Sequence, residues 1–297
     1  MKSFEIKNIL VIRTDPLAGE KIIIQNDFAE AQIYLLGGHL THFQPKGTEK
    51  VIYDGKESYI LPPKSAHFGI PVCWPWFGPH PTDKTKSQHG FARNCLWNIT
   101  QTAMLKDGCT SVTLSLQESQ ETLKHYPHSF YLELTFIIGK RLQIALKTTN
   151  SSNTTMQITQ ALHSYFYVGN LHEIRICGLE GRTFIDQLDN QTSKKESKPL
   201  QFTQSLDRIY IPSSDTCEII DTVLKRKIRI EKKHSNSTVV WNPWKNNTLH
   251  DIQGDRYSKF VCIETANVKE DRITLEPNES YTLIQTISLE NLSKQQC

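Results

Sequence analysis

Two β-forming runs separated by a short turn are the feature that most limits how this chain folds. FYLELTFII at 130–138 is followed by Gly139-Lys140-Arg141 and then by LQIALKTT at 142–149. Runs rich in branched and aromatic residues predict strands, and the glycine between them predicts a tight hairpin. Similar runs, closed by Gly, Asn, Asp or Pro, recur as KIIIQ, AQIYLL, SVTLSLQ, MQITQALHSYFYV, KIRIEK, STVVW, KFVCIET and YTLIQTISL. We therefore expect an all-β protein that forms one large sandwich domain over residues 1–297.

Few segments depart from this pattern. SQETLKHY at 119–126 predicts a short helix, and DNQTSKKESKPLQ at 189–201 predicts an exposed loop. We expect any site to lie on a hollow or curved face of the sandwich.

Composition excludes several classes of function. The 34 Lys and Arg residues exceed the 31 Asp and Glu residues by only three, which does not favour binding to nucleic acid or to a membrane surface. No apolar run reaches the roughly 18 residues of a membrane span, and MKSFEIKNIL does not resemble a secretory signal. The seven cysteines are an odd number without a C-x-x-C pair, so we expect reduced thiols and a cytoplasmic location.

The sequence does not predict a metal or a cofactor. Its 11 histidines form no H-x-H or H-E-x-x-H pattern, and the cysteines are scattered. Phosphate-binding and nucleophile-elbow motifs are also missing from it.

Two predicted strands carry chemically useful side chains. If 156–169 is one strand, His163 shares a polar, aromatic face with Tyr165 and Tyr167. Glu264 in KFVCIETANV at 259–268 stands between apolar residues, where a carboxylate is costly unless it is paired or functional. The alternatives are a structural hydrogen bond for His163 and a buried salt bridge to Arg or Lys for Glu264.

Two proline-stiffened segments hold large aromatic residues. GIPVCWPWFG at 69–78 contains Trp74, Trp76 and Phe77, and WNPWKN at 241–246 contains Trp241. Proline at these spacings forbids a helix and a central strand. The aromatic side chains are either plugs in the core or walls of a small-molecule pocket.

Two further segments carry polar candidates. In QHGFARN at 88–94, Gly90 permits a turn or a close backbone approach, and Arg93 suits an oxyanion. The alternatives are purely structural roles, a capped turn for His89 and a surface salt bridge for Arg93. In SLDRIY at 205–210, Asp207 has the alternative of pairing with Arg208 or with solvent.

Six motifs in this order resemble the hexose-6-phosphate mutarotases (glucose-6-phosphate 1-epimerases) of the galactose mutarotase-like, or aldose 1-epimerase, superfamily. They are GIPVCWPWFGPH, QHGFARNCLWNI, ALHSYFYVGN, SLDRIY, WNPW and VCIETANV, and the resemblance runs from about residue 30 to about residue 285. It implies a large antiparallel β-sandwich (a supersandwich) with a sugar on the concave face of one sheet. The implied enzyme is an isomerase that needs no cofactor.

The resemblance also implies roles for individual residues. Glu264 corresponds to the base at the C1 hydroxyl and His163 to the acid at the ring oxygen. We expect His163 to be protonated in the working form, favoured by a nearby carboxylate. Asp207 corresponds to an acidic residue near the sugar hydroxyls that tunes His163. His89 and Arg93 correspond to substrate-binding residues, and Trp76 and Trp241, with Trp74 and Phe77, are expected to form or brace the wall against the sugar.

One departure affects the expected substrate. Members of the family carry Arg-Gly-Gly before IPV, whereas this chain has His67, Phe68 and Gly69. The family arginine helps to bind the substrate phosphate, and a histidine offers fewer donors. Either Arg93 and Lys64 bind the phosphate, or the sugar is unphosphorylated, or the protein binds sugars without efficient turnover.

The leading hypothesis is a monomeric, cofactor-independent mutarotase acting on a small sugar, glucose 6-phosphate or a similar aldose. Two alternatives are a carbohydrate-binding or sensing protein on the same scaffold and, more weakly supported, a metal-dependent sugar isomerase.

Overall fold

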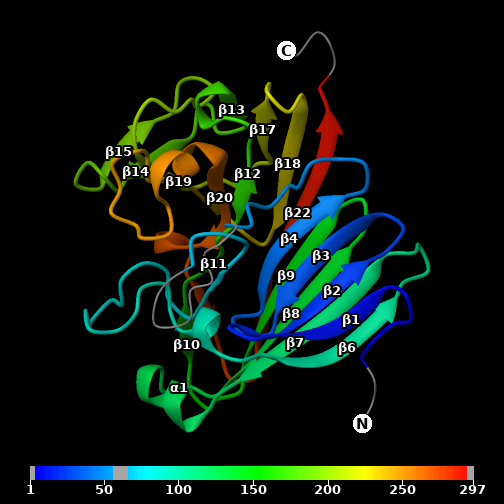
Figure 1. The fold of residues 1–297 in the computed structure, drawn as a ribbon. Helices are drawn as coiled ribbons and strands as arrows, with labels where there is room; N and C mark the ends of the chain where they lie inside the picture. Colours follow the sequence, from blue (N-terminus) through cyan, green and yellow to red (C-terminus); the bar gives the residue numbers. More distant parts are fainter. Residues whose placement is uncertain (1–3, 56–65, 293–297) are drawn as a thin grey trace.

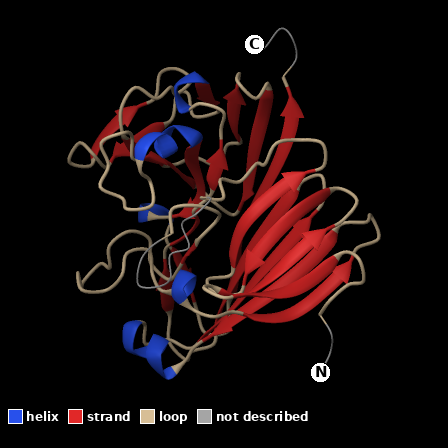
Figure 2. Cartoon of the chain, in the orientation of Figure 1, coloured by secondary structure: helices blue, strands red, loops and turns tan. Residues whose placement is uncertain are grey.

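The chain forms stacked β-sheets whose strands are connected mainly by loops, with a few short helices (Figure 2), as seen in a computed structural model that describes residues 4–55 and 66–292. Every pairing between its named strands is antiparallel. The expected large antiparallel β-sandwich is therefore confirmed. In the described part of the chain, no helix has the length and apolar character needed to cross a membrane.

The first of two eight-stranded sheets runs in the order β13-β17-β18-β22-β9-β8-β7-β6. Its strands are β6 (Asn98–Met104), β7 (Thr110–Gln117), β8 (Phe130–Ile138), β9 (Leu142–Asn150), β13 (Ile174–Cys177), β17 (Cys217–Asp221), β18 (Arg226–Lys233) and β22 (Ser280–Asn291). The predicted hairpin is confirmed, because β8 and β9 pair across the turn and the Gly139 N–H donates to the Arg141 carbonyl at 3.0 Å.

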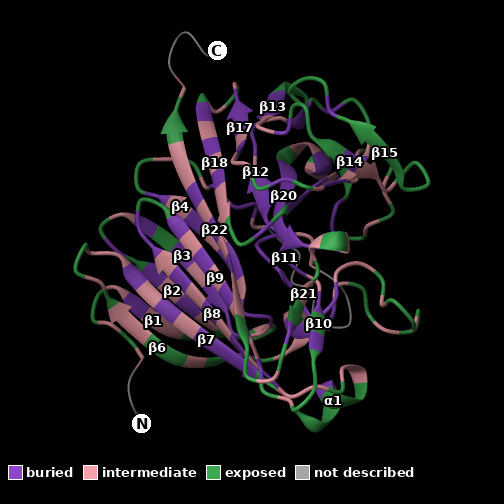
Figure 3. Cartoon of the chain, turned by 180° about the vertical axis from the view of Figure 1, so that it is seen from behind, coloured by how far each residue is buried: buried purple, intermediate pink, exposed green. Residues whose placement is uncertain are grey.

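A four-stranded sheet covers one face of this sheet (Figure 1). Its strands are β1 (Leu10–Asp15), β2 (Gly19–Gln25), β3 (Ala29–Tyr34) and β4 (His39–Pro45). Ile22 and Ile24 of β2 and Leu134 of β8 belong to one continuous buried cluster. Figure 3 shows how buried and partly exposed residues alternate along these strands. The period-two pattern of the sequence thus determines which side chains form the core.

The second eight-stranded sheet runs in the order β15-β14-β16-β19-β20-β11-β5, with β12 also paired to β20. Its strands are β5 (Val72–Cys73), β11 (Gln160–Leu162), β12 (Tyr165–Tyr167), β14 (Thr183–Asp186), β15 (Thr192–Lys195), β16 (Leu206–Tyr210), β19 (Ser237–Asn242) and β20 (Phe260–Asn267). A separate pair consists of β10 (Met156–Ile158) and β21 (Ile273–Leu275). Every residue of β20 is buried. This strand carries Glu264, a residue of the site described below.

Two predictions of local structure need correction. Residues 156–169 form β10, β11 and β12 rather than one strand, because the segment is interrupted at Thr159 and at residues 163–164, where the Ser164 N–H turns back to the Leu162 carbonyl at 2.9 Å. The predicted loop 189–201 contains the exposed edge strand β15, which pairs with β14. Tertiary pairing decided both cases, and a single sequence does not reveal it.

The helical elements are short. They are α1 (Gln120–His125) and the 3₁₀ turns η1 (Ala92–Asn94), η2 (Leu171–Glu173), η3 (Gly254–Lys259) and η4 (Lys269–Asp271). The helix predicted at 119–126 is confirmed, and the Ser119 side chain caps it by accepting from the Thr122 N–H.

Candidate active site

A cavity of about 520 Å³, here called the reaction cavity, lies over one face of the second eight-stranded sheet. Its lining includes seven of the predicted site residues: His67, His89, Arg93, His163, Asp207, Trp241 and Glu264. These residues come from separate strands and loops, so the fold rather than the local sequence brings them together.

His163 and Glu264 lie side by side in this cavity. β11 pairs with β20 so that Leu162 is opposite Thr265, which places the next residue, His163, beside Glu264. The His163 Nε2 atom is 3.4 Å from the Glu264 Oε1 atom. Both side chains are buried, and the atoms His163 Nδ1 and Glu264 Oε2 have no hydrogen-bond partner among the described residues. The Glu264 carboxyl group thus contacts a histidine.

Burial disfavours charge on both members of this pair. Burial raises the pKa of Glu264 well above its ordinary value, and the charge of Asp207 adds to this effect. Burial also lowers the pKa of His163 well below its ordinary value, with further lowering by His89 and Arg93. The expectation of a protonated His163 concerns the working form, and burial opposes it in the free protein, because burial disfavours the charged imidazole.

Asp207 stands on β16, opposite Trp241 of β19. Burial and the nearby charge of Asp186 raise the pKa of Asp207 to about 6. Its charge raises the pKa of Glu264. The expected influence on His163 stays a prediction.

Segment 88–94 lies against the proline-rich segment 71–79. Gly90 has φ +74°, and a Cβ atom there would collide with the Trp74 carbonyl, so the predicted close backbone approach is confirmed. The His89 N–H donates to the Gly78 carbonyl at 2.7 Å, and the His89 ring lies edge-on to the His163 ring with centroids 5.6 Å apart. Burial, with the charges of Arg93 and His67, lowers the pKa of His89 to about 3. His89 is therefore neutral at pH 7.

Arg93 belongs to η1 and donates from Nη2 to the Gln88 carbonyl at 2.7 Å. Its positive charge lowers the pKa of His163 and opposes the upward shift of Glu264. Arg93 therefore acts electrostatically on both members of the pair.

The aromatic residues of 69–78 divide between three environments. Trp74 is a core plug, with its ring centroid 4.4 Å from that of Phe130. Phe77 lines the reaction cavity, but Trp76 lies outside it and lines a neighbouring cavity instead. The Trp76 indole N–H donates to the Ser87 carbonyl at 3.0 Å, which holds the ring in that position. The predicted contact between Trp76 and the sugar is thus not supported by the position of this residue.

Trp241 and Tyr165 form aromatic walls next to the pair. The Tyr165 ring stacks on the His163 ring, with centroids 4.8 Å apart and an interplanar angle of 9°. The Trp241 ring stands edge-on to the His163 ring at 6.0 Å. A sugar's apolar C–H face can pack on such walls.

His67, at the position of the family arginine, is held by Asp251. Asp251 Oδ1 lies 2.8 Å from the His67 Nδ1 atom, and Oδ2 accepts the His67 N–H at 2.9 Å. Sequence reasoning missed Asp251, since nothing local links positions 184 residues apart. It also missed Gln187 and Asn94, which line the cavity without any motif. Lys64, considered as a phosphate ligand, lies outside the described residues.

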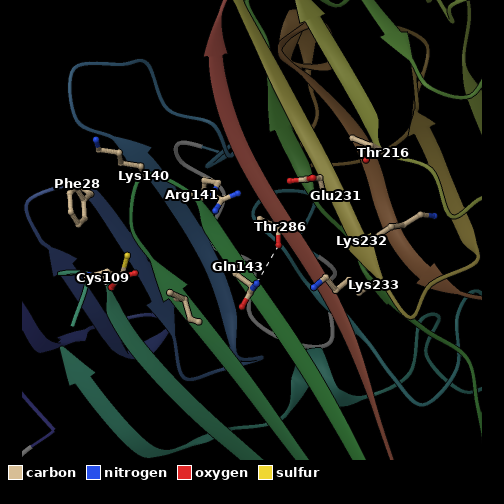
Figure 4. A pocket seen from close by; sticks show the side chains of 12 residues that line it. Phe28, Cys109, Lys140, Arg141, Gln143, Thr216, Glu231, Lys232, Lys233 and Thr286 are labelled. Carbon is tan, nitrogen blue, oxygen red and sulfur yellow. Dashed lines mark hydrogen bonds between the residues drawn. The ribbon is translucent and has the colours of Figure 1, made fainter. Parts of the chain in front are cut away.

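A second large cavity, of about 770 Å³, lies beside β9, β22 and β18 (Figure 4). Lys140, Arg141 and Lys233 line it together with Glu231, and Gln143 contacts Thr286 at 3.5 Å. Its described lining residues include no predicted site residue and no histidine, so they do not offer the acid–base pair found in the reaction cavity.

Comparison with known proteins agrees with the geometry. The family model described as aldose 1-epimerase matches residues 20–288. A protein of Escherichia coli (strain K12), described as a candidate glucose-6-phosphate 1-epimerase, is 34% identical over 259 residues, which cover 86% of each chain. A protein of Cenchrus ciliaris with the same description is 32% identical over 265 residues, covering 84% of this chain and 78% of the relative. The crystal structure of a candidate mutarotase from Salmonella typhimurium superimposes with a TM-score of 0.87 at 29% identity, covering 97% of this chain and 95% of the other.

Proposed function

The chain belongs to the aldose 1-epimerase family and is a sugar isomerase, and we propose that it interconverts the α and β anomers of a hexose 6-phosphate with His163 and Glu264 as its acid–base pair. The single observation that carries the assignment of residues is the 3.4 Å contact between His163 Nε2 and Glu264 Oε1 in the reaction cavity.

The reaction explains why the two groups need to be neighbours. The C1 hydroxyl of a pyranose must lose a proton while the ring oxygen gains one. Both oxygens are bonded to C1, so an acid and a base that serve them must lie almost in contact. His163 and Glu264 meet this condition, and Glu264 Oε2 and His163 Nδ1 have no hydrogen-bond partner in the described part of the chain.

The number of protons on the pair also suits this reaction. Burial favours a neutral His163 and a protonated Glu264, which together hold one dissociable proton. Hydrogen bonds from the sugar hydroxyls stabilise the carboxylate, so the proton passes from Glu264 to His163 across the short contact. Glu264 then takes the proton of the C1 hydroxyl, His163 protonates the ring oxygen, and the bond between C1 and that oxygen breaks. Rotation about C1–C2 and the reverse proton transfers close the ring on the other face.

The identity of the sugar is supported by the relatives, which are described as acting on glucose 6-phosphate. One observation favours an unphosphorylated aldose instead, namely His67 at the position of the family arginine. The proposal also includes a monomer and a cytoplasmic location, the latter supported by six described cysteines that are all free thiols.

The test is anomer exchange, measured by NMR with glucose 6-phosphate, glucose and galactose. The wild-type protein is expected to accelerate exchange of glucose 6-phosphate most. Glu264→Gln is expected to lower kcat by about 10²–10⁴-fold, whereas Glu30→Gln, which removes an exposed carboxylate, is expected to change nothing. Sugar binding without any acceleration would favour the binding-protein alternative, and full activity in Glu264→Gln would reject the assigned base.

A further inference from the structure

A third cavity adjoins the reaction cavity and has no part in the chemistry described so far. It has a volume of about 510 Å³, close to that of its neighbour, and is here called the side cavity. Trp76 and Tyr126 line one part of it, and Gln191, Lys269 and Arg272 line another.

The two cavities share part of their walls. Phe77, Gly78, Pro79 and Gln187 line both of them, so the side cavity lies directly beside the reaction cavity. Val268, the residue that follows β20, lines the side cavity four residues beyond Glu264. The same strand therefore leads from the acid–base pair to the side cavity.

The charged groups of the two cavities differ. The reaction cavity contains the guanidinium group of Arg93 as well as the carboxyl groups of Asp207 and Glu264. The side cavity has Lys269 and Arg272 on its wall, and no carboxylate is among its described lining residues. A phosphate dianion in the side cavity is attracted by two cations, whereas in the reaction cavity the Asp207 carboxylate opposes the attraction of Arg93.

The two cations of the side cavity have hydrogen-bond donors that can still bind an anion. The Lys269 Nζ atom donates to the neutral Gln191 Oε1 atom at 3.0 Å, which leaves further donors of the ammonium group for a ligand. The Arg272 guanidinium has no ion pair or side-chain hydrogen bond to any described residue. In contrast, His67 already faces the Asp251 carboxylate, and Arg93 Nη2 already donates to a carbonyl oxygen.

We propose that the side cavity is the subsite for the anionic substituent of the sugar, with Lys269 as its principal ligand and Arg272 as a more exposed second one. This inference rests on the proposed function, since it assigns the phosphate group of the proposed substrate to the side cavity. It explains how the chain binds a sugar phosphate without an arginine at position 67.

The experiment compares kcat/KM for glucose 6-phosphate with kcat/KM for glucose in each variant. The ratio is used because Lys269 also acts on the Asp207 charge, which affects both substrates alike. Lys269→Gln is expected to lower the ratio about 10-fold, and Arg272→Gln about 3-fold. Lys269→Arg is expected to keep the ratio near the wild-type value. The control Lys106→Gln, which removes an exposed charge that lines neither cavity, is expected to leave the ratio unchanged.

Two results would overturn the assignment. One is an unchanged ratio in Lys269→Gln together with a fall in Arg93→Lys or His67→Ala, which places the anion in the reaction cavity. The other is a loss of affinity for a disaccharide such as maltose instead of glucose 6-phosphate, which makes the side cavity a neutral sugar subsite.

A binding measurement separates this inference from the proposed function. Calorimetric titration with inorganic phosphate is expected to show binding to the wild type and loss of binding in Lys269→Gln. If anomer exchange is never accelerated but this difference is seen, the proposed function fails and the anion subsite stands. If phosphate binds both proteins equally, the subsite is wrong whatever the activity.

Discussion

Asp251 binds His67 through both of its carboxylate oxygens, one on the ring Nδ1 atom and one on the backbone N–H. The contact joins a loop before β5 to a loop before η3 and orients the imidazole on the wall of the reaction cavity. Asp251 is therefore a positioning residue for His67.

Asp251→Asn is expected to destabilise the fold by about 1–3 kcal/mol, because the partly buried His67 donors lose a charged acceptor. Urea unfolding measures this change, and KM for the sugar reports the loss of orientation. Asp255→Asn, an exposed change in the neighbouring η3, is the matched control. Equal unfolding midpoints for the two variants would contradict the role of Asp251.

The same contact predicts a pH dependence of stability. Burial raises the pKa of Asp251, but the hydrogen bonds and charge of His67 outweigh it and hold the pKa below 3.8. A lowered folded-state pKa means that the stabilisation is complete above 3.8 and is lost as the pH falls through the folded value. The stability difference between wild type and Asp251→Asn should therefore shrink below pH 4. A difference that does not depend on pH would argue against this linkage.

Glu264 predicts the opposite trend. Its pKa is raised by burial and by Asp207, so the stability it confers is complete below 4.5 and declines as the pH rises through the folded-state value. Thermal unfolding of Glu264→Gln, which cannot ionise, should show a Tm that gains on the wild type between pH 5 and pH 8. Parallel curves would show that Glu264 is ionised without cost in the folded protein.

The pKa of Asp207 leads us to expect a pH dependence of KM. With a pKa of about 6, it is a carboxylate at pH 7 and accepts hydrogen bonds from sugar hydroxyls, and it loses this ability as the pH falls below 6. KM for glucose should therefore rise towards pH 5, and Asp207→Asn should flatten the profile. Glucose is the substrate of choice because a phosphate ester itself titrates near pH 6.

Gly90 predicts a specific structural weakness. Gly90→Ala places a Cβ atom against the Trp74 carbonyl, which cannot move without displacing the segment that carries Phe77. We expect a loss of more than about 3 kcal/mol, whereas Gly47→Ala, also at φ +74° but in open space, should cost only about 1 kcal/mol. Chemical denaturation of both variants checks this, and similar costs would show that the close approach is unimportant.

Much of this architecture follows from local sequence. The alternation in 130–138 and 142–149 predicts which side chains face the core, because side chains in a pleated strand point to opposite faces in turn. The same rule placed His163 and Tyr165 on the cavity side even though the predicted strand is broken. The glycine between the two runs was sufficient to predict their hairpin.

Other features were decided only by tertiary structure. Whether Trp76 faces the sugar depends on how 71–79 lies against 88–94, and the contact of Asp251 with His67 depends on loops distant in sequence. The neutral state of His163 likewise depends on burial and on Arg93 and His89, which other segments bring near. Periodicity and turn residues act over a few neighbours and can be read along the chain. Contacts between distant segments, and the electrostatic effects of their charged groups on one another, arise only once the strands have paired.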